Sequence, residues 1–370
     1  MSRTPVPPSP PSPPSPPSTT SASPTTPRRA TISDVAREAG TGKTSISRYL
    51  NGEFNVLSAE LRARIEAAIE RLDYRPNQMA RGLKRGRNRL IGMLLADLSN
   101  PYSVEVLQGV EAACQALGYM PLICHAANEV EMEGRYLQLL TTYRVEGVIV
   151  NALGVREAML KPVGSGGIPS VLVDRTVEGL DADMVGLDNE AAVRLGTAHL
   201  LERGYEEIVF VVQPYEHVSS RRRRVTAFED AMRATPQVRA DTVVLDLQND
   251  EAASATLAAL DERIGKGADE RPHDARPRIA LFAGNAPVAL RIALHLNARY
   301  GAQWQRRVGL IAFDDPDWAE LAGITTIRQP TRAIGYRAVE FLHQRIEGLA
   351  DVARECVLPG ELIVRASTGG

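Results

Sequence analysis

Cysteine, histidine and tryptophan are all scarce in this sequence. It holds three cysteines, six histidines and two tryptophans among 370 residues. Cys114, Cys124 and Cys356 lie far apart, and neither they nor the histidines have the spacing of a metal site. An odd and sparse set of thiols suits a reducing compartment. We therefore expect no metal, no cofactor and a cytoplasmic location.

Long apolar runs are also missing. No stretch of about 18 apolar residues occurs, and the N-terminus lacks an apolar signal core. These absences favour a soluble protein and argue against a periplasmic transport receptor. An enzyme is the other rival, but the sequence has no Gly-x-Ser-x-Gly elbow, phosphate-binding glycine loop or nucleophile–base pair at diagnostic spacing. We therefore expect a protein that is not an enzyme.

Charge is distributed unevenly, although the formal net charge is only −2. Residues 28–89 carry 14 Lys and Arg against 7 Asp and Glu, a net of +7. The 281 residues that follow carry 28 basic and 38 acidic side chains, a net of −10. A basic N-terminal module on an acidic body is typical of a polyanion reader attached to a domain with another task.

The first 27 residues contain 11 prolines and 7 serines. Such a composition has too few apolar side chains to bury a core. We predict a disordered tail over residues 1–29.

The stretch TISDVAREAGTGKTSISRYLN predicts two short helices joined by a tight turn. Thr31 can cap the first helix, with Asp34 as its partner in a capping box. Gly40 suits a turn that needs a positive φ. The second helix should run from about residue 43 to 50, with Ile46 on its inward face. This spacing is typical of a helix-turn-helix, although an ordinary pair of helices is the alternative.

The outward face of the second helix carries short hydroxyls and cations, which suit base edges and phosphates. These residues are Lys43, Thr44, Ser45, Ser47 and Arg48. A third amphipathic helix follows, then a Tyr-x-Pro-Asn break and the basic segment 77–84. Eight residues are too few for a stable free helix.

At this point the chain resembles the lactose-repressor/galactose-repressor (LacI/GalR) family of bacterial transcription regulators, over roughly residues 30–367. The matching residues are Ile32, Asp34, Val35, Ala36, Ala39, Gly40, Ser47, Arg48, Asn51, Tyr74, Pro76, Asn77, Ala80 and Leu83. The chain departs from the family after the turn glycine, where Thr41 and Gly42 replace an aliphatic residue and a serine.

The resemblance implies a DNA-binding headpiece at 30–75 and a linker at 76–88 that forms a hinge helix only on DNA. Leu83 would then wedge into the minor groove at a central base step. The expected DNA-binding residues are Thr31, Lys43, Thr44, Ser45, Ser47, Arg48, Asn51, Asn77, Ala80, Leu83 and Lys84.

From residue 89 onward strands and helices alternate, which predicts parallel sheets with right-handed crossovers. Roughly 280 residues divide naturally into two units. The pattern resembles the α/β two-lobed domain of periplasmic binding proteins, and the fold class is an all-α headpiece plus this domain. We expect an effector-binding and dimerisation domain at 89–367. Its lobe N would comprise about 89–188 plus 324–341, and its lobe C 189–323 plus 342–367.

Ligands of open parallel sheets bind beyond the carboxyl ends of the strands. Strand ends here include Asp97, Asp174 with Arg175, and Asp314, and an arginine run occupies 221–224. The expected ligand-binding residues, taken with the family's effector positions, are Asp97, Asn100, Tyr102, Asp174, Arg222, Arg224, Asn285 and Asp314. Helix capping is the alternative role for Asp and Asn at these positions.

Arg224 lies in an Arg-x-Arg-x-x-x-Phe motif that matches the family's effector-binding arginine. An arginine in a cleft suits a carboxylate or phosphate, which favours a sugar acid as the effector. Parts of the headpiece and linker resemble the gluconate or 2-ketogluconate repressor subgroup. A neutral sugar, a non-sugar ligand and a transport-type sugar-binding protein remain as alternatives.

We therefore predict a transcriptional repressor that binds double-stranded, pseudopalindromic operator DNA and a small effector. The family's long tetramerising tail does not follow the last strand, so we expect a homodimer. The sequence leaves open whether the effector induces or co-represses.

Overall fold

The computed structural model describes residues 29–75, 87–151, 167–177, 180, 182–268, 279–349 and 352–369. Contacts divide the chain into two units, Met1–Arg81 and Gly82–Gly370. The predicted linker at 76–88 spans this division, and most of it lies outside the described residues. Over the described ranges, no helix is both long and apolar enough to cross a membrane.

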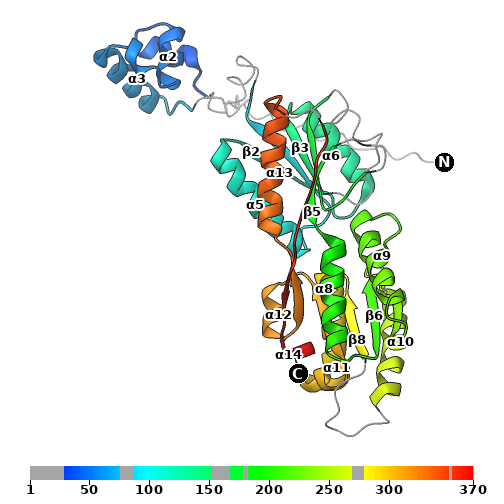
Figure 1. Ribbon diagram of the computed structural model, residues 1–370. Coiled ribbons are helices and arrows are strands. Elements are labelled where there is room, and N and C mark those ends of the chain that lie inside the picture. Colours follow the sequence, from blue (N-terminus) through cyan, green and yellow to red (C-terminus); the bar gives the residue numbers. More distant parts are fainter. Residues whose placement is uncertain are drawn as a thin grey trace, which may run out of the picture. The chain divides into compact units, whose positions relative to one another are not determined.

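The first unit contains the headpiece (Figure 1). Its helices are α1 (Ile32–Glu38), α2 (Lys43–Leu50), the short 3-10 helix η1 (Phe54–Val56) and α3 (Ala59–Arg71). The predicted capping box is confirmed, because the side chain of Thr31 accepts from the Asp34 amide and the side chain of Asp34 accepts from the Thr31 amide. Gly40 has a φ of +61°, as the turn requires. The two helices of the helix-turn-helix therefore begin and end where the sequence indicated.

Small and aliphatic side chains make the headpiece core. Val35 and Ala36 of α1, Ile46 of α2, and Ile65 and Ala68 of α3 are buried together. The prediction that Ile46 lies on the inward face of the second helix is therefore confirmed.

The second unit contains two six-stranded sheets. The first has the order β11 (Glu355–Leu358), β5 (Asp183–Leu187), β4 (Ser170–Val173), β3 (Gly147–Asn151), β1 (Leu90–Leu95) and β2 (Met120–His125). The second has the order β12 (Glu361–Ile363), β10 (Thr325–Arg328), β9 (Gly309–Phe313), β8 (Ile279–Ala283), β6 (Glu207–Val212) and β7 (Arg239–Val244). All pairings are parallel except that of β10 with β12. The predicted fold class is confirmed.

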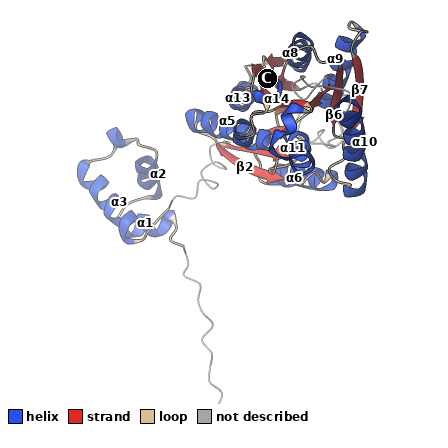
Figure 2. Cartoon of the chain, turned by 90° about the horizontal axis from the view of Figure 1, so that it is seen from below, coloured by secondary structure: helices blue, strands red, loops and turns tan. Residues whose placement is uncertain are grey.

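Helices cover both faces of each sheet, so each lobe has three layers (Figure 2). In the first lobe, α5 (Pro101–Leu117) and α13 (Thr331–Ile346) pack on one face and α6 (Val130–Thr142) on the other. In the second lobe, α8 (Asn189–Glu202) and α9 (Ser219–Arg233) face α10 (Asp250–Ala268) and α11 (Ala286–Tyr300) across the sheet. The shorter elements are η2 (Gly301–Arg306), α12 (Asp317–Leu321) and α14 (Ala366–Gly369).

Within the described residues the chain passes between the lobes three times, and only the first crossing lies where the sequence suggested. It falls at residue 188, between β5 and α8, whereas the other two fall at 329–330 and 359–360. The prediction of 324–341 for lobe N was wrong for β10, which pairs with β9 in the second sheet. The prediction of 342–367 for lobe C was wrong for β11, which pairs with β5 in the first. Both strands have four residues, and long-range pairing rather than local pattern assigns each to its sheet.

The polar composition of the stretch Arg263 to Pro277 predicts a loop, but α10 continues to Ala268. Leu257, Leu260 and Ile264 are buried at helical spacing against the second sheet. This apolar stripe extends into the stretch, so its first part is helical.

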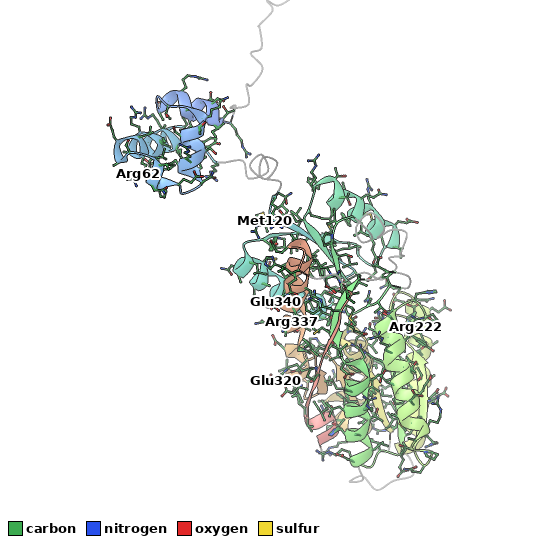
Figure 3. The ribbon with its side chains drawn as sticks, turned by 45° about the horizontal axis from the view of Figure 1, so that its top comes forward. Arg62, Met120, Arg222, Glu320, Arg337 and Glu340 are labelled. Carbon is green, nitrogen blue, oxygen red and sulfur yellow. The ribbon has the colours of Figure 1, made fainter. Side chains whose placement is uncertain are left out.

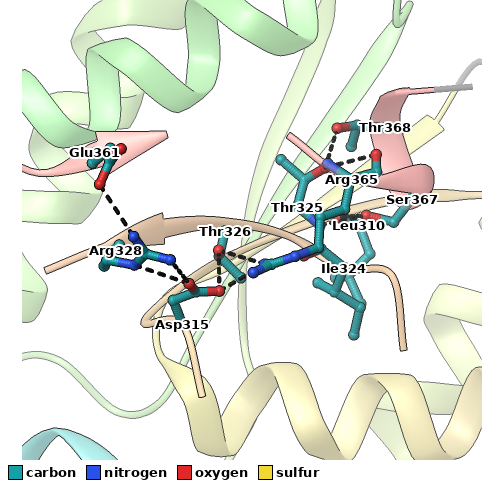
Figure 4. Close-up of polar contacts among 10 residues, drawn as sticks. All are labelled: Leu310, Asp315, Ile324, Thr325, Thr326, Arg328, Glu361, Arg365, Ser367 and Thr368. Carbon is teal, nitrogen blue, oxygen red and sulfur yellow. Dashed lines mark hydrogen bonds and ion pairs between the residues drawn. The ribbon is translucent and has the colours of Figure 1, made fainter. Parts of the chain in front are cut away.

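The C-terminal segment is fixed to the second lobe through polar contacts (Figure 4). Asp315 accepts hydrogen bonds from Arg365, Arg328 and Thr326. Ser367 is buried, accepts from the Thr325 amide at 2.8 Å and donates to the Leu310 carbonyl at 2.5 Å. These contacts join the last helix to strands β9 and β10.

Candidate functional site

A cavity of about 450 Å³ lies between the lobes of the second unit, beyond the carboxyl ends of the strands. Seven of the eight predicted ligand-binding residues line it, namely Asp97, Asn100, Tyr102, Asp174, Arg224, Asn285 and Asp314. Both lobes contribute, because Asp97 and Asp174 follow strands of the first sheet while Asp314 follows a strand of the second.

Arg222 is the exception. Its side chain is exposed on the outside of α9 and does not line the cavity (Figure 3). Residues three and four apart share one face of a helix, and Arg221 and Arg224 of α9 take the face toward the cavity. The prediction that Arg222 binds a ligand therefore does not fit this geometry.

Arg224 is only 5% exposed and its position is well determined by its neighbours. Its Nε donates to the side-chain oxygen of Asn189 and its Nη1 to the carbonyl of Gly284, each at 2.7 Å. The guanidinium carbon lies 4.0 Å from the centre of the Phe313 ring, which is a cation–π distance. All three partners belong to the second lobe, so this lobe holds Arg224 rigidly at the cavity wall.

Asp314 is 6% exposed and adopts a φ of +72° at the end of β9. One carboxylate oxygen accepts from the Ala286 amide at 2.9 Å and the other from Gln329 at 2.6 Å. Burial raises the pKa of Asp314 against the opposing effect of Arg224. This carboxylate fixes the start of α11, so its role in the protein is structural as well as cavity-lining.

Asn100 and Asn285 combine helix capping with access to the cavity, and Asp97 combines contacts within its own loop with that access. Asn100 and Asn285 are the N-caps of α5 and α11. Asp97 accepts from Ser99 and Asn128, and these bonds hold its pKa below the ordinary value although burial opposes them. An ionised Asp97 is suited to accept hydrogen bonds from ligand hydroxyls.

Two of the polar atoms that are buried at the cavity without a hydrogen-bond partner among the described residues belong to predicted ligand contacts. They are the hydroxyl of Tyr102 and Oδ1 of Asp174. Burial raises the pKa of Tyr102 well above its ordinary value, so its hydroxyl keeps its proton. Buried polar groups are rarely left unpaired, and a polyhydroxylated ligand would satisfy both of these.

Several cavity residues were not among the predicted ligand contacts. They include Asn128, Asn151, Gln213, Ser220, Arg221, Asp246, Gln248 and Gln329. Gln213 directly follows β6 and Gln329 directly follows β10. The strand-end rule that selected Asp97 would have found these two, had β10 been recognised as a strand. No group of three His, Cys, Asp or Glu able to hold a metal occurs within the described ranges.

The predicted DNA-binding side chains of α2 are all at least partly accessible to solvent. Lys43, Thr44 and Arg48 are exposed, and Ser45 and Ser47 are half-buried. Gly42 is the N-cap of α2 and supplies no side-chain hydrogen bond.

Two more predicted DNA-binding residues flank these helices. Thr31 caps α1, and Asn51 is the C-cap of α2. The predicted linker contacts Asn77, Ala80, Leu83 and Lys84 lie outside the described residues.

Curated proteins similar to this chain are transcriptional regulators. Residues 31–77 match the family described as bacterial regulatory proteins, lacI family, and residues 197–368 match a periplasmic binding protein-like domain. The chain is 44% identical to the HTH-type transcriptional regulator PtxS of Pseudomonas aeruginosa, covering 92% of this chain and 96% of that protein. It is 32% identical to the HTH-type transcriptional regulator KdgR of Bacillus subtilis, covering 92% and 98%.

A crystal structure of the lac repressor dimer bound to operator and the anti-inducer ONPF has the same fold. Its TM-score to this chain is 0.74 at 23% identity, and the match covers 92% of this chain and 99% of that one.

Proposed function

Since the chain belongs to the lacI family of bacterial regulatory proteins and is a DNA-binding transcriptional regulator, we propose that it represses transcription as a dimer on a pseudopalindromic operator. A sugar acid bound between its lobes controls this repression. The observation that carries the proposal is the interlobe cavity, where three arginines accompany carboxylates and amides in a chain with a helix-turn-helix.

The exposed face of α2 supports the DNA-binding part of the proposal. Lys43 and Arg48 suit phosphates and guanine edges, and Thr44 suits either kind of group. Two headpieces would place two α2 helices in adjacent major grooves. Leu83 would open the central base step, and the protein would work where the chromosome is, in the cytoplasm.

The side chains of the cavity support the choice of effector. Arg175, Arg221 and Arg224 line it, and guanidinium groups bind carboxylates with paired hydrogen bonds. Asp97 and Tyr102 offer an acceptor and a donor to hydroxyls. A sugar acid has both kinds of group, and gluconate and 2-ketogluconate are the proposed members of the class.

A neutral sugar is the second candidate. The four aspartates of the cavity, Asp97, Asp174, Asp246 and Asp314, favour it, because carboxylates accept hydrogen bonds from hydroxyls and repel another carboxylate.

The experiment is fluorescence anisotropy of the full-length protein on DNA from upstream of its own gene. Binding is measured at several salt concentrations, with and without gluconate, 2-ketogluconate and fructose. We expect tight, salt-sensitive binding that one of the two acids alters and fructose does not. Alteration by fructose alone would replace the sugar acid with a neutral sugar. Failure to bind at any salt concentration would contradict the assignment of α2 as the DNA-reading helix.

A further inference from the structure

Two hydrogen bonds join the lobes beside the cavity. The Ser220 hydroxyl donates to Oδ2 of Asp174 at 2.9 Å, and the Thr176 amide donates to the Ser219 hydroxyl, also at 2.9 Å. The first lobe contributes the loop after β4, and the second lobe contributes the first turn of α9. Both bonds are direct, so the two segments meet at this point.

Arg175 and Arg221 belong to the same two segments. Arg175 lies between Asp174 and Thr176, and Arg221 follows Ser220. Both arginines line the cavity. Each lobe therefore contributes one guanidinium group to the cavity, next to the two hydrogen bonds that join the lobes.

The surroundings of Arg221 leave its charge without a full counter-charge. Its Nη1 donates to the Pro214 carbonyl at 2.8 Å and its Nη2 to Oε1 of Gln213 at 2.6 Å, and both acceptors are neutral. Burial, followed by repulsion from Arg175, lowers the pKa of Arg221 to about 10, which Asp174 only partly offsets.

The carboxylate of Asp174 acts on both arginines. Oδ2 of Asp174 lies 3.7 Å from Nε of Arg175 and also accepts from Ser220. Both oxygens of Asp314 already accept hydrogen bonds, one from the Ala286 amide and the other from Gln329. Asp246 and Asp97 line the cavity as well, but neither is among the charges that shift the pKa of Arg221. Of the charges that shift the pKa of Arg221, two are arginines, Arg175 and Arg224, and one is a carboxylate, Asp174.

We propose that Arg175 and Arg221 form a clamp in which the two lobes bind one anionic group of the effector together. The inference rests on the proposed function and deepens it, because it assigns the carboxylate of the sugar acid to this pair. A carboxylate between the guanidinium groups accepts from both and relieves their repulsion. Binding of the charged effector thus favours the arrangement in which the two segments meet, and a neutral sugar lacks this effect.

Arg224 has a different role in this arrangement. Two of its nitrogens are bonded to Asn189 and Gly284, and its ring contact is with Phe313, all in the second lobe. It supports the ligand from one side, whereas the clamp joins both lobes through the ligand. The specificity for an acid over a neutral sugar therefore resides in Arg175 and Arg221.

The test is isothermal titration calorimetry of the full-length protein with gluconate, 2-ketogluconate, glucose and fructose at low and high salt. The variants are Arg175→Gln, Arg221→Gln and the double variant. The matched control is Arg222→Gln, which removes the same side chain from the exposed face of the same helix. Operator binding without ligand and the thermal transition check that each variant is folded.

Each clamp variant should lose about 10- to 100-fold in affinity for the acid that binds wild type, the size expected for a charge-assisted hydrogen bond. The salt dependence of that affinity should also weaken. The affinity for any neutral sugar should fall by less than about threefold. The double variant should lose less than the product of the single losses, because both groups share one carboxylate. Arg222→Gln should match wild type.

Three outcomes would overturn the clamp. If an acid binds wild type and Arg221→Gln equally well, the clamp is wrong and the sugar-acid effector stands. If Arg221→Gln weakens the binding of glucose or fructose as much as the binding of the acid, the role of Arg221 is structural. If neither acid binds wild type, the proposed effector class fails and the clamp fails with it.

Discussion

Asp183 begins β5 with its side chain fully buried, and two arginines from distant parts of the chain meet it. Arg345 and Arg354 each donate to both of its oxygens, at distances from 2.7 to 3.3 Å. The Arg354 amide adds a bond of 2.8 Å. Burial alone would raise the pKa of Asp183, but these hydrogen bonds lower it to about 2. The ionised carboxylate therefore fastens α13 and the segment before β11 to the first sheet.

Asp183→Asn should lower the free energy of unfolding by about 3 kcal/mol, because it leaves two partly buried guanidinium groups without their counter-ion. The native pKa lies below the ordinary value, so the stabilisation is complete above about pH 4 and is lost as the pH falls toward 2. Urea unfolding at pH 7 and at several acidic pH values measures both effects. The variant should lose less stability on acidification than wild type. Asp230→Asn, which breaks an exposed ion pair with Arg233, should change stability by less than about 0.5 kcal/mol.

Gly40 and Gly42 offer a matched comparison within one turn. A Cβ would meet no atom within 4 Å at either position, but only Gly40 has a positive φ. Gly40→Ser should therefore destabilise the headpiece by about 1 kcal/mol. Gly42→Ser should stabilise it by roughly 0.5–1 kcal/mol, because Gly42 already has the extended backbone of an N-cap and serine adds a capping oxygen. Amide hydrogen exchange in α1 to α3 of the full-length protein measures both. Equal signs for the two changes would contradict the backbone argument.

At the scale of single residues, contacts between near neighbours in the sequence could be predicted, and contacts between residues far apart in the sequence could not. The Thr31–Asp34 capping box spans three residues and follows from residue types alone. The Asp183–Arg354 contact joins residues 171 positions apart, and no local pattern marks either of them. Arg222 was selected by its motif, but the face of a helix that turns inward depends on what packs against it.

Helices α5 and α13 pack so closely that glycines are required where they cross. A Cβ on Gly335 would lie 2.1 Å from the carbonyl oxygen of Val106, and one on Gly109 would lie 2.1 Å from that of Arg332. Both obstacles are backbone atoms, which cannot rotate away. The two helices lie lengthwise beside each other in the first lobe (Figure 1). Backbone contacts therefore fix the separation of the two helices.

Gly335→Ala should destabilise the first lobe by at least about 2 kcal/mol, since a methyl group fits only if the helices separate. Gly265→Ala is the control, because Gly265 lies within α10 with no atom within 4 Å of its Cβ. That change should stabilise the protein by roughly 0.5–1 kcal/mol. Chemical denaturation of the two variants gives the comparison. A neutral Gly335→Ala would show that the helices can part without cost.

Most of the buried strands could be predicted from the sequence, because β1, β3, β4, β6, β8 and β9 are mainly continuous apolar runs. The exceptions are informative. The short strand β5 was not predicted, and the end of α10 was expected to be a loop. The sequence of β5, DMVGL, begins with an aspartate and so lacks the continuous apolar run that marks the other buried strands.

At the scale of the whole second unit, helix α13 connects the ligand cavity to Arg87, a residue of the predicted linker at 76–88. Gln329, just before the helix, lines the cavity and donates to Asp314. At the other end, Arg87 donates to the Ile346 carbonyl at 3.0 Å and to Glu347 at 2.5 Å. A rigid helix between the two ends is a physical route for coupling effector binding to the linker.

Glu347→Gln should weaken this coupling while leaving each binding step in place. Operator affinity without effector and effector affinity without DNA should stay within about threefold of wild type. The ratio of operator affinities with and without effector should move several-fold toward one, because the linker is no longer fixed to α13. Glu340→Gln on the same helix removes only an exposed pair with Arg337 and should keep the wild-type ratio (Figure 3). An unchanged ratio in Glu347→Gln would exclude this anchor from the coupling.

The two later crossings between the lobes also affect how the chain folds during translation. The first sheet is complete only when β11 pairs with β5, and Leu358 follows Leu187 by 171 positions. A ribosome adding roughly 5–20 residues per second needs about 10–30 seconds for that interval. During this time β5 is an edge strand without its β11 partner. The headpiece is translated earlier and has already emerged from the ribosome. The nascent chain thus carries its DNA-reading part before the domain that controls it, and chaperone protection of that edge is most needed late in translation.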